Sequence, residues 1–239
     1  MNANRLKGIA CVSMLLDHIG FLLLPWEGWL RWCGRLALPI FAYLIAEGCR
    51  HTRNRKQYFL RLLGLGLLCQ LATVGEALLY GATNRIVLNI LITLSAAQLV
   101  CFTWLDFVDA YRLRQGQSRA AIRFLLTIAG VAVAVKLGTA LAPVTGVMVT
   151  FDYGLTGLLL PWFALLFSSR RLQLLSFGVG IVFVCLSLYP AMPFVWLSLL
   201  SLPLLALYNG QRGSRRWKYA FYAFYPMHFA VIYGIRQFM

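Results

Sequence analysis

Acidic residues are scarce in this chain, in which seven aspartates and glutamates stand against 22 lysines and arginines among 239 residues. Charged residues of both signs make up only 12% of the sequence, against roughly 25% in soluble proteins. The longest polar connection, Asp106 to Arg119, is too short to bury a hydrophobic core of its own. The sequence therefore predicts no separate soluble domain.

Motifs for metal binding and redox chemistry are missing as well. The six cysteines show no CxxC pattern and no Cys/His ligand spacing, so we interpret them as small packing residues outside any disulfide framework. No metal site is predicted. The chain also has no visible long-range repeat, which leaves an inverted-repeat transporter without support.

Hydrophobic residues, by contrast, make up 61% of the chain, and the mean hydropathy is +0.75. Because about 20 apolar residues cross a bilayer as a helix, these values predict an all-α, polytopic integral membrane protein. No small-residue cleavage site follows Asn2 to Lys7, so the first span is expected to remain in the mature protein. We expect one domain over residues 1–239 with about nine spans, near 8–26, 32–49, 58–80, 86–105, 121–142, 147–167, 173–190, 192–207 and 217–237.

Lysine and arginine are distributed unequally between alternate connections. One side of the predicted bundle holds seventeen of them, whereas the other holds only Arg31, Arg85 and Arg236. By the positive-inside rule the N-terminus is cytoplasmic, and with nine spans the C-terminus lies on the opposite side. We expect the location to be a bacterial inner membrane. Since topology accounts for the basic charge, the sequence gives no reason to infer nucleic-acid binding.

Two ionisable residues, Asp17 and His18, stand in the middle of the apolar run from Gly8 to Trp26. A charged residue at the centre of a membrane helix costs roughly 2.5 kcal/mol or more, so a functional use is the default hypothesis. Lys7 and His18 are eleven residues apart, which at about 100° per residue places them on nearly the same helix face. This stripe joins the cytoplasmic surface to the membrane midplane.

Other polar residues fall at a similar depth when the predicted spans are aligned. For Asn89, a hydrogen bond that packs helices together is a simpler interpretation than a ligand contact. For Arg35, a structural ion pair with Asp17 or Asp152 is as good an interpretation as a functional role. Each histidine alone could be a core hydrogen-bonding residue. A neutral imidazole can also act as a general base or a nucleophile, and a nearby carboxylate would orient the imidazole ring. The layer between the midplane and the outer third contains Asp17, His18, Arg35, Asn89, Asp152 and His228, whereas Glu47 lies near a cytoplasmic helix end.

The connection after the second span is strongly basic and reads RHTRNRKQYFLR from Arg50 to Arg61. One interpretation is a topology determinant that contacts lipid headgroups. The other is a docking site for a phosphate-bearing cosubstrate, because arginine and lysine both bind phosphate. The residues that would form this site are Arg50, Arg53, Arg55 and Lys56.

The order and spacing of several strings resemble the TraX family of bacterial membrane proteins, named for a conjugal-transfer protein that acetylates pilin subunits. The resemblance covers nearly the whole chain. Its strings are LKGIACVSMLLDHIG at Leu6 to Gly20, GRLALPIFAYLIAEGCRHTRNRKQYFLRLL at Gly34 to Leu63, LNIL around Asn89, DYGLTGLLL at Asp152 to Leu160, LYNGQRG at Leu207 to Gly213 and KYAFYAFYPMHFAVI at Lys218 to Ile232.

That family looks like a branch of a superfamily of transmembrane acyltransferases, in which a basic residue, ten intervening residues and a histidine form a motif on the first helix. Lys7 and His18 fit this spacing. The resemblance implies acetyl-CoA as the cosubstrate, supplied from the cytoplasm, with Lys7 and the Arg50 to Arg61 connection on the CoA side. It implies a pocket of Asp17, His18, Arg35, Asp152, Tyr225 and His228, next to which Asn89, Tyr153 and Glu47 are further candidates.

The resulting hypothesis is an integral-membrane acetyltransferase acting on a membrane-embedded or extracytoplasmic acceptor, such as a pilin-like peptide N-terminus. We expect His228 in the direct chemical role, the pair Asp17 and His18 as its partner, and Arg35 or Tyr225 as the oxyanion donor. O-acetylation of an envelope glycan or lipid is the close alternative. A proton-coupled secondary transporter and a non-catalytic membrane scaffold are alternatives from other classes.

Overall fold

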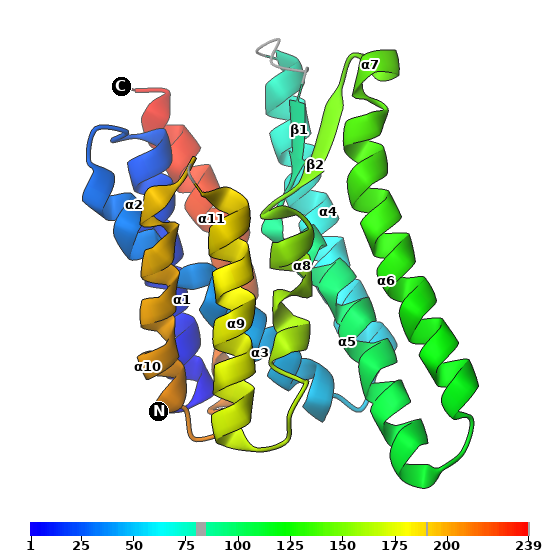
Figure 1. Cartoon of the computed structure of the whole chain (residues 1–239). Coiled ribbons are helices and arrows are strands. Elements are labelled where there is room, and N and C mark those ends of the chain that lie inside the picture. Colours follow the sequence, from blue (N-terminus) through cyan, green and yellow to red (C-terminus); the bar gives the residue numbers. More distant parts are fainter. Residues whose placement is uncertain (80–84, 190, 239) are drawn as a thin grey trace. The chain divides into compact units, whose positions relative to one another are not determined.

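The computed structural model describes residues 1–79, 85–189 and 191–238, and most of them are helical (Figure 1). The chain forms two compact units, of which the first joins Met1–Leu44 to Arg170–Met239 and the second is Ile45–Ser169. The first unit therefore combines both ends of the chain. The prediction of a single domain over 1–239 stays a prediction.

The first unit is built around α1 (Ala3–Leu22), which packs against α2 (Gly28–Gly34) and α11 (Lys218–Arg236). The side chain of Asn2 caps α1 by accepting a hydrogen bond from the Arg5 amide at 3.1 Å. The predicted span 32–49 is interrupted, because α2 ends at Gly34 and the next helix begins at Ala37. The other elements are the first half of α3 (Ala37–His51), α9 (Arg170–Leu188), the 3₁₀ helix η1 (Pro193–Leu200), α10 (Ser201–Ala206) and the 3₁₀ helix η2 (Arg215–Trp217).

The second unit is a helical bundle with a small sheet. Buried Ala97, Val100, Phe124 and Leu158 form its core, which is covered by Trp104 and other partly buried side chains. Its elements after α3 are α4 (Arg55–Leu79), β1 (Arg85–Leu88), α5 (Ile90–Leu113), α6 (Gln117–Ala140), α7 (Ala142–Thr145), β2 (Met148–Phe151) and α8 (Gly154–Phe163).

The two strands β1 and β2 were not predicted, and the all-α prediction is wrong at these residues. They pair in parallel with Arg85 opposite Met148 and Leu88 opposite Phe151. The predicted span 86–105 begins inside β1, and the predicted span 147–167 begins one residue before β2 and includes all of it. A hydropathy window of about 20 residues merges a short apolar strand with the helix that follows it, and periodicity cannot separate the two.

A glutamine side chain satisfies one open edge of this sheet. Gln70 in α4 donates from Nε2 to the Val87 carbonyl at 3.2 Å and accepts at Oε1 from the Asn89 amide at 2.8 Å. The carboxamide thus pairs with β1 as a peptide group of a third strand would. The Asn89 side chain in turn donates to the Gly66 carbonyl at 2.8 Å and caps α5. Because an apolar environment offers no water to unpaired backbone groups, these bonds allow strands to exist there.

We expect Gln70→Leu to lower the free energy of unfolding by about 2–6 kcal/mol, because the Val87 carbonyl and the Asn89 amide lose this partner and each unsatisfied group costs ~1–3 kcal/mol. Thermal unfolding in detergent would measure the change. Gln115→Leu makes the same chemical change at an exposed position and should leave the transition nearly unchanged. Equal transitions for the two variants would contradict the role of Gln70.

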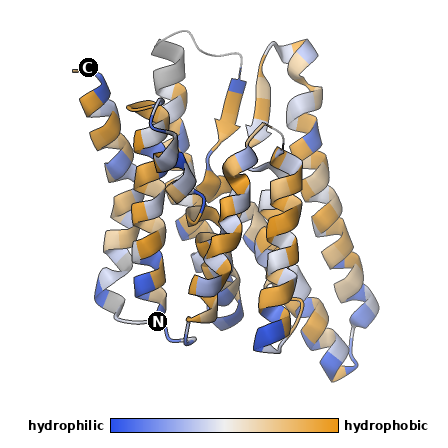
Figure 2. Cartoon of the chain, turned by 60° about the vertical axis from the view of Figure 1, so that its left-hand side comes forward, coloured by the Kyte–Doolittle hydropathy of each residue, from blue (hydrophilic) through white to orange (hydrophobic). Residues whose placement is uncertain are grey.

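Four helices among the described residues are long and apolar enough to cross a membrane: Arg55–Gly75, Ile90–Leu113, Gln117–Thr145 and Arg170–Leu188. Figure 2 shows apolar residues along much of the helices and hydrophilic residues near many helix ends. Shorter apolar helices cover Gly154–Phe163 and Pro193–Ala206. These four helices support the prediction of a membrane protein. The predicted number of nine spans is not confirmed.

Candidate functional site in the first unit

Two histidines from opposite ends of the chain meet in the first unit. Nδ1 of His18 in α1 is 3.0 Å from Nε2 of His228 in α11, and the two ring centroids are 5.0 Å apart. Lys7, which also faces α11, places its Nζ 5.5 Å from the centroid of the Phe221 ring. The predicted stripe of Lys7 and His18 on one face of the first helix is therefore confirmed.

The hydrogen bonds determine which nitrogen of each imidazole carries a hydrogen. His228 Nδ1 lies 2.9 Å from the Phe224 carbonyl, which can only accept, so this nitrogen carries a hydrogen. In a neutral ring His228 Nε2 is then an acceptor, and His18 Nδ1 must donate to it. The remaining nitrogen, His18 Nε2, keeps its lone pair and makes no hydrogen bond within the described part of the chain.

Aromatic side chains of α11 surround this pair. The Phe229 ring centroid is 4.5 Å from that of His18 and 4.4 Å from that of His228, and Phe224 stacks on His228 at 5.2 Å. Tyr225, a predicted pocket residue, lies edge-on to His228 at 5.5 Å. His228 is only 4% exposed. This packing limits rotation of the imidazoles and excludes water from most of His228.

The Asp17 side chain leaves α1 at about 100° from that of His18, because consecutive helix residues differ by this angle, and it contacts α2 at Gly34. Its carboxylate forms a close ion pair with Arg35, whose side chain is 3% exposed. Nε of Arg31 lies 3.8 Å from the same carboxylate oxygen. The interpretation of Arg35 as a partner of Asp17 is confirmed, whereas a role of Asp17 in the reaction stays a prediction. The hydrogen-bonding partner of His18 Nδ1 is His228.

A glycine makes room for this ion pair. A Cβ atom added to Gly34 in α2 would lie 2.3 Å from Asp17 Cβ and 2.6 Å from Asp17 Oδ1, far inside contact distance. Only glycine therefore fits where α2 approaches the carboxylate. The sequence did not single out Arg31 as a site residue, because it lies in the connection between two predicted spans. A positive charge in such a connection needs no special explanation. The four-residue spacing of Arg31 from Arg35, whose Nε donates to the Arg31 carbonyl at 3.1 Å, was the available signal.

Candidate functional site in the second unit

Asn89, Asp152 and Tyr153 lie together where β1 and β2 end. The Asp152 amide donates to the Leu88 carbonyl at 3.0 Å, and the Thr93 hydroxyl donates to the Asp152 carbonyl at 3.3 Å. Tyr153 has a positive φ of 58° and leads into α8. The packing interpretation of Asn89 is favoured because its side chain is used to cap α5. That these residues share one layer with Asp17 and His18 stays a prediction.

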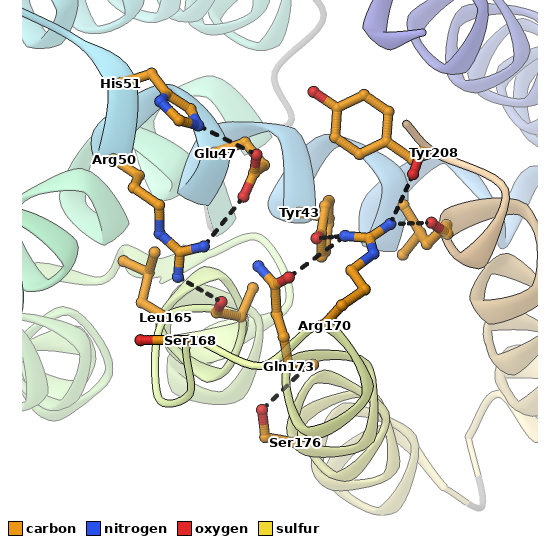
Figure 3. A network of polar contacts seen from close by, with 12 residues as sticks. Tyr43, Glu47, Arg50, His51, Leu165, Ser168, Arg170, Gln173, Ser176 and Tyr208 are labelled. Carbon is orange, nitrogen blue, oxygen red and sulfur yellow. Dashed lines mark hydrogen bonds and ion pairs between the residues drawn. The ribbon is translucent and has the colours of Figure 1, made fainter. Parts of the chain in front are cut away.

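Several residues of the basic connection already have partners. Arg50 Nη1 and His51 Nε2 pair with the Glu47 carboxylate at 3.5 and 3.6 Å, and Arg50 also donates to the Ala164 carbonyl at 3.4 Å (Figure 3). Arg55 forms a close ion pair with Asp106. These contacts give Glu47, Arg50 and Arg55 structural roles in holding α3, α4, α5 and α8.

The exposed basic residues nearby border an open hollow. It has a volume of about 360 Å³ and is lined by Asn54, Lys56, Gln57, Leu60 and Arg61. Lys56, Arg61 and Arg53 form no ion pair among the described residues. Lys56 and Arg61 can therefore bind an anion without breaking an existing pair, and Arg61 extends the predicted set.

Arg170 of the first unit is a further cation, partly buried at the start of α9 (Figure 3). Its guanidinium donates to the Tyr43 hydroxyl, the Leu205 carbonyl and Gln173 Oε1, and its Cζ lies 5.6 Å from the Tyr208 ring centroid. These acceptors are neutral, and all of them bind the two terminal nitrogens, Nη1 and Nη2. We therefore interpret Arg170 as a structural clamp. Within the described ranges no cluster of three His, Cys, Asp or Glu side chains could hold a metal ion.

Comparison with known proteins places these features in a family. The family described as "TraX protein" matches residues 2–236. A relative from Dichelobacter nodosus, named "Probable fimbrial assembly protein FimC, serogroup H1", is 27% identical over 259 residues, which cover 100% of this chain and 97% of the relative. No solved structure matches the chain. The match over nearly all of its length means that the chain belongs to the TraX family.

Proposed function

We propose that this protein is an integral-membrane acetyltransferase that moves an acetyl group from acetyl-CoA to an amine or hydroxyl of an envelope acceptor. The observation that carries the proposal is the hydrogen-bonded pair of His18 and His228, which leaves His18 Nε2 as an available base. A base held by a second polar group is the usual arrangement for activating a nucleophile. Membership of the TraX family, which the sequence resemblance links to pilin acetylation, supports the same reaction.

In the proposed step His18 Nε2 removes a proton from the neutral amine or the hydroxyl of the acceptor as it attacks the thioester carbonyl. The tetrahedral intermediate collapses as the C–S bond breaks, and the proton passes to the departing CoA thiolate. His228 accepts the hydrogen bond from His18 Nδ1 throughout and stabilises the imidazolium. This assigns the direct role to His18, whereas the sequence led us to expect His228 there. Arg35 or Tyr225 would stabilise the oxyanion.

The placement in a superfamily of transmembrane acyltransferases is part of this proposal. It is supported by the spacing of Lys7 and His18 and by their common orientation towards α11. Nine spans, a cytoplasmic N-terminus and a bacterial inner membrane location are proposed with it, on the strength of the unequal distribution of lysine and arginine. In this topology Lys7 and the basic connection face the cytosol, where acetyl-CoA is present.

We expect the double variant Lys56→Gln, Arg61→Gln to raise the Kd of acetyl-CoA by about ten- to hundredfold, since two charge-assisted phosphate contacts are lost. Isothermal titration of the protein in nanodiscs would measure it. The double variant Arg119→Gln, Arg123→Gln removes the same charge from exposed positions on α6 and should bind normally. Equal losses in both double variants would indicate a general charge effect and contradict a site at the hollow.

The reaction itself is tested with radiolabelled acetyl-CoA and membrane vesicles. Inverted vesicles, which expose the cytoplasmic face, should release CoA and transfer label to an acceptor, whereas right-side-out vesicles should not, because acetyl-CoA does not cross the bilayer. Mass spectrometry of the labelled fraction would distinguish a peptide N-terminus from an O-acetylated glycan. The D. nodosus relative's name directs the first search to fimbrial subunits. No turnover with any envelope fraction would refute the proposal.

A further inference from the structure

A groove runs along the face of α1 that the proposed reaction does not use. It has a volume of about 590 Å³, and all the residues that line it belong to the first unit. Arg5, Val12 and Leu16 are among these residues. At about 100° per residue they lie on the side of α1 opposite Lys7 and His18. The groove is therefore separate from the histidine pair.

Most of the groove is lined by apolar side chains. Leu16 and Leu36 contribute alkyl groups, and Val12 is 58% exposed. The Ser13 hydroxyl also lines the groove, but it already donates to the Cys33 carbonyl at 2.6 Å. This stretch thus has no polar side chain that needs a partner from a ligand. We expect its occupant to be a hydrocarbon, because burial of apolar surface is what such a lining rewards.

A glycine keeps the groove open. A Cβ atom added to Gly8 would meet no atom within 4 Å, whereas one added to Gly20, also in α1, would lie 2.7 Å from Leu30 Cβ. Gly20 is therefore explained by the close approach of α2, but Gly8 is not explained by any described neighbour. Glycine is one of the least favourable residues inside a helix. Its use here is explained if a ligand lies against α1 at this point.

The start of α1 places a positive charge at one end of the groove. Arg5, in the first turn of α1, is exposed, and its guanidinium forms no ion pair or hydrogen bond among the described residues. The terminal amine of Met1, which also lines the groove, donates to the Leu207 carbonyl at 2.6 Å. The Arg5 guanidinium is therefore available to an anionic group of a ligand.

The length of the groove matches one leaflet of a bilayer. Arg5 and Leu16 are eleven positions apart, which corresponds to about 16 Å along a helix. Half of the hydrocarbon core of a bilayer is ~15 Å thick. With the predicted first span at 8–26, Arg5 lies at the membrane surface and Leu16 near the midplane. A lipid with its headgroup at Arg5 would place one acyl chain along the whole groove.

We propose that this groove binds an anionic phospholipid, with the phosphate at Arg5 and one acyl chain against Gly8, Val12 and Leu16. A guanidinium binds phosphate oxygens through several N–H groups. An anionic headgroup is favoured over a zwitterionic one, which would bring a second cation close to Arg5. The lipid supports α1 from the side opposite His18. This inference does not depend on the proposed acetyl transfer.

Native mass spectrometry of the full chain in detergent, with single lipids added, measures the Kd of the first bound lipid. Phosphatidylglycerol should bind with a Kd about tenfold or more below that of phosphatidylcholine. Arg5→Gln should remove this preference, whereas Arg119→Gln, at an exposed position on α6, should keep it. Gly8→Leu fills the groove and should raise the Kd of phosphatidylglycerol about tenfold or more, whereas Gly130→Leu in α6 should not.

The variants also define the results that would overturn the site. Equal Kd values for the two lipids, or a preference that survives in Arg5→Gln, would refute the role of the arginine. An unchanged Kd in Gly8→Leu would refute the groove as the binding site. Dimers that disappear in Gly8→Leu while lipid binding stays the same would identify a second copy of the chain as the occupant. If Gly8→Leu does not fold, Val12→Trp blocks the groove from an exposed position and should weaken binding equally.

Discussion

Replacement of His18 with asparagine is expected to lower the rate of acetyl transfer by about two to four orders of magnitude, the usual contribution of a general base. The asparagine amide can still donate to His228 Nε2 from near the position of Nδ1, but it has no group at the position of Nε2. The variant should therefore fold normally and fail in catalysis. Initial rates with labelled acetyl-CoA, together with thermal unfolding in detergent, would measure both effects.

The variants of His228 decide which histidine acts directly. If His228 only accepts a hydrogen bond from His18, then His228→Gln, which can place an oxygen near Nε2, should retain more activity than His228→Ala. If His228 were the base, as the sequence led us to expect, both variants would be equally inactive. His51→Ala serves as the control, because this third histidine is 69% exposed on α3. Normal activity in His18→Asn would contradict the assignment.

The second large effect is expected on stability. Asp17→Asn should lower the free energy of unfolding by about 3–5 kcal/mol, because it removes the carboxylate that forms a close ion pair with the buried Arg35 cation. Arg35, which lies between α2 and α3, is only 3% exposed, so water does not replace the lost carboxylate. Chemical unfolding in detergent, followed by tryptophan fluorescence, would measure the change. Asp109→Asn makes the same substitution at an exposed site on α5 and should have little effect.

A double variant tests whether the lost stability comes from the ion pair itself. Asp17→Leu combined with Arg35→Met replaces both charges with apolar side chains and should recover most of the loss, since buried pairs are often replaceable together. A double variant as unstable as Asp17→Asn would indicate that packing around Gly34, and not the unpaired charge, is responsible.

Sequence reasoning located the functional residues of the first unit better than their roles. The helical spacing of Lys7 and His18 was sufficient to place both on one face, and the cost of burying ionisable groups singled out His18, Asp17 and His228. The partner of each was not predictable. Adjacent residues on a helix face different neighbours, so Asp17 meets α2 and His18 meets α11.

The second unit shows a different limit. Asn89 drew attention as an intramembrane amide, yet its side chain caps α5 and bonds the Gly66 carbonyl. Gln70, which holds the edge of β1, was not singled out, because a glutamine in an apolar helix has no pattern that indicates a strand partner. Similarly, the charges of Arg50 and Arg55 suggested phosphate binding, but their pairing with Glu47 and Asp106 depends on contacts between helices.

The amino-acid sequence by itself determined that this is a membrane protein of the TraX type, because long apolar runs and the order of local strings are properties of the linear chain. It also determined which side chains are too costly to bury without a use. Only the tertiary structure decided that His18 bonds to His228, whereas Asp17 pairs with Arg35. These contacts depend on which helix each face of α1 meets, and the contact of the two histidines is made by packing between segments 210 residues apart.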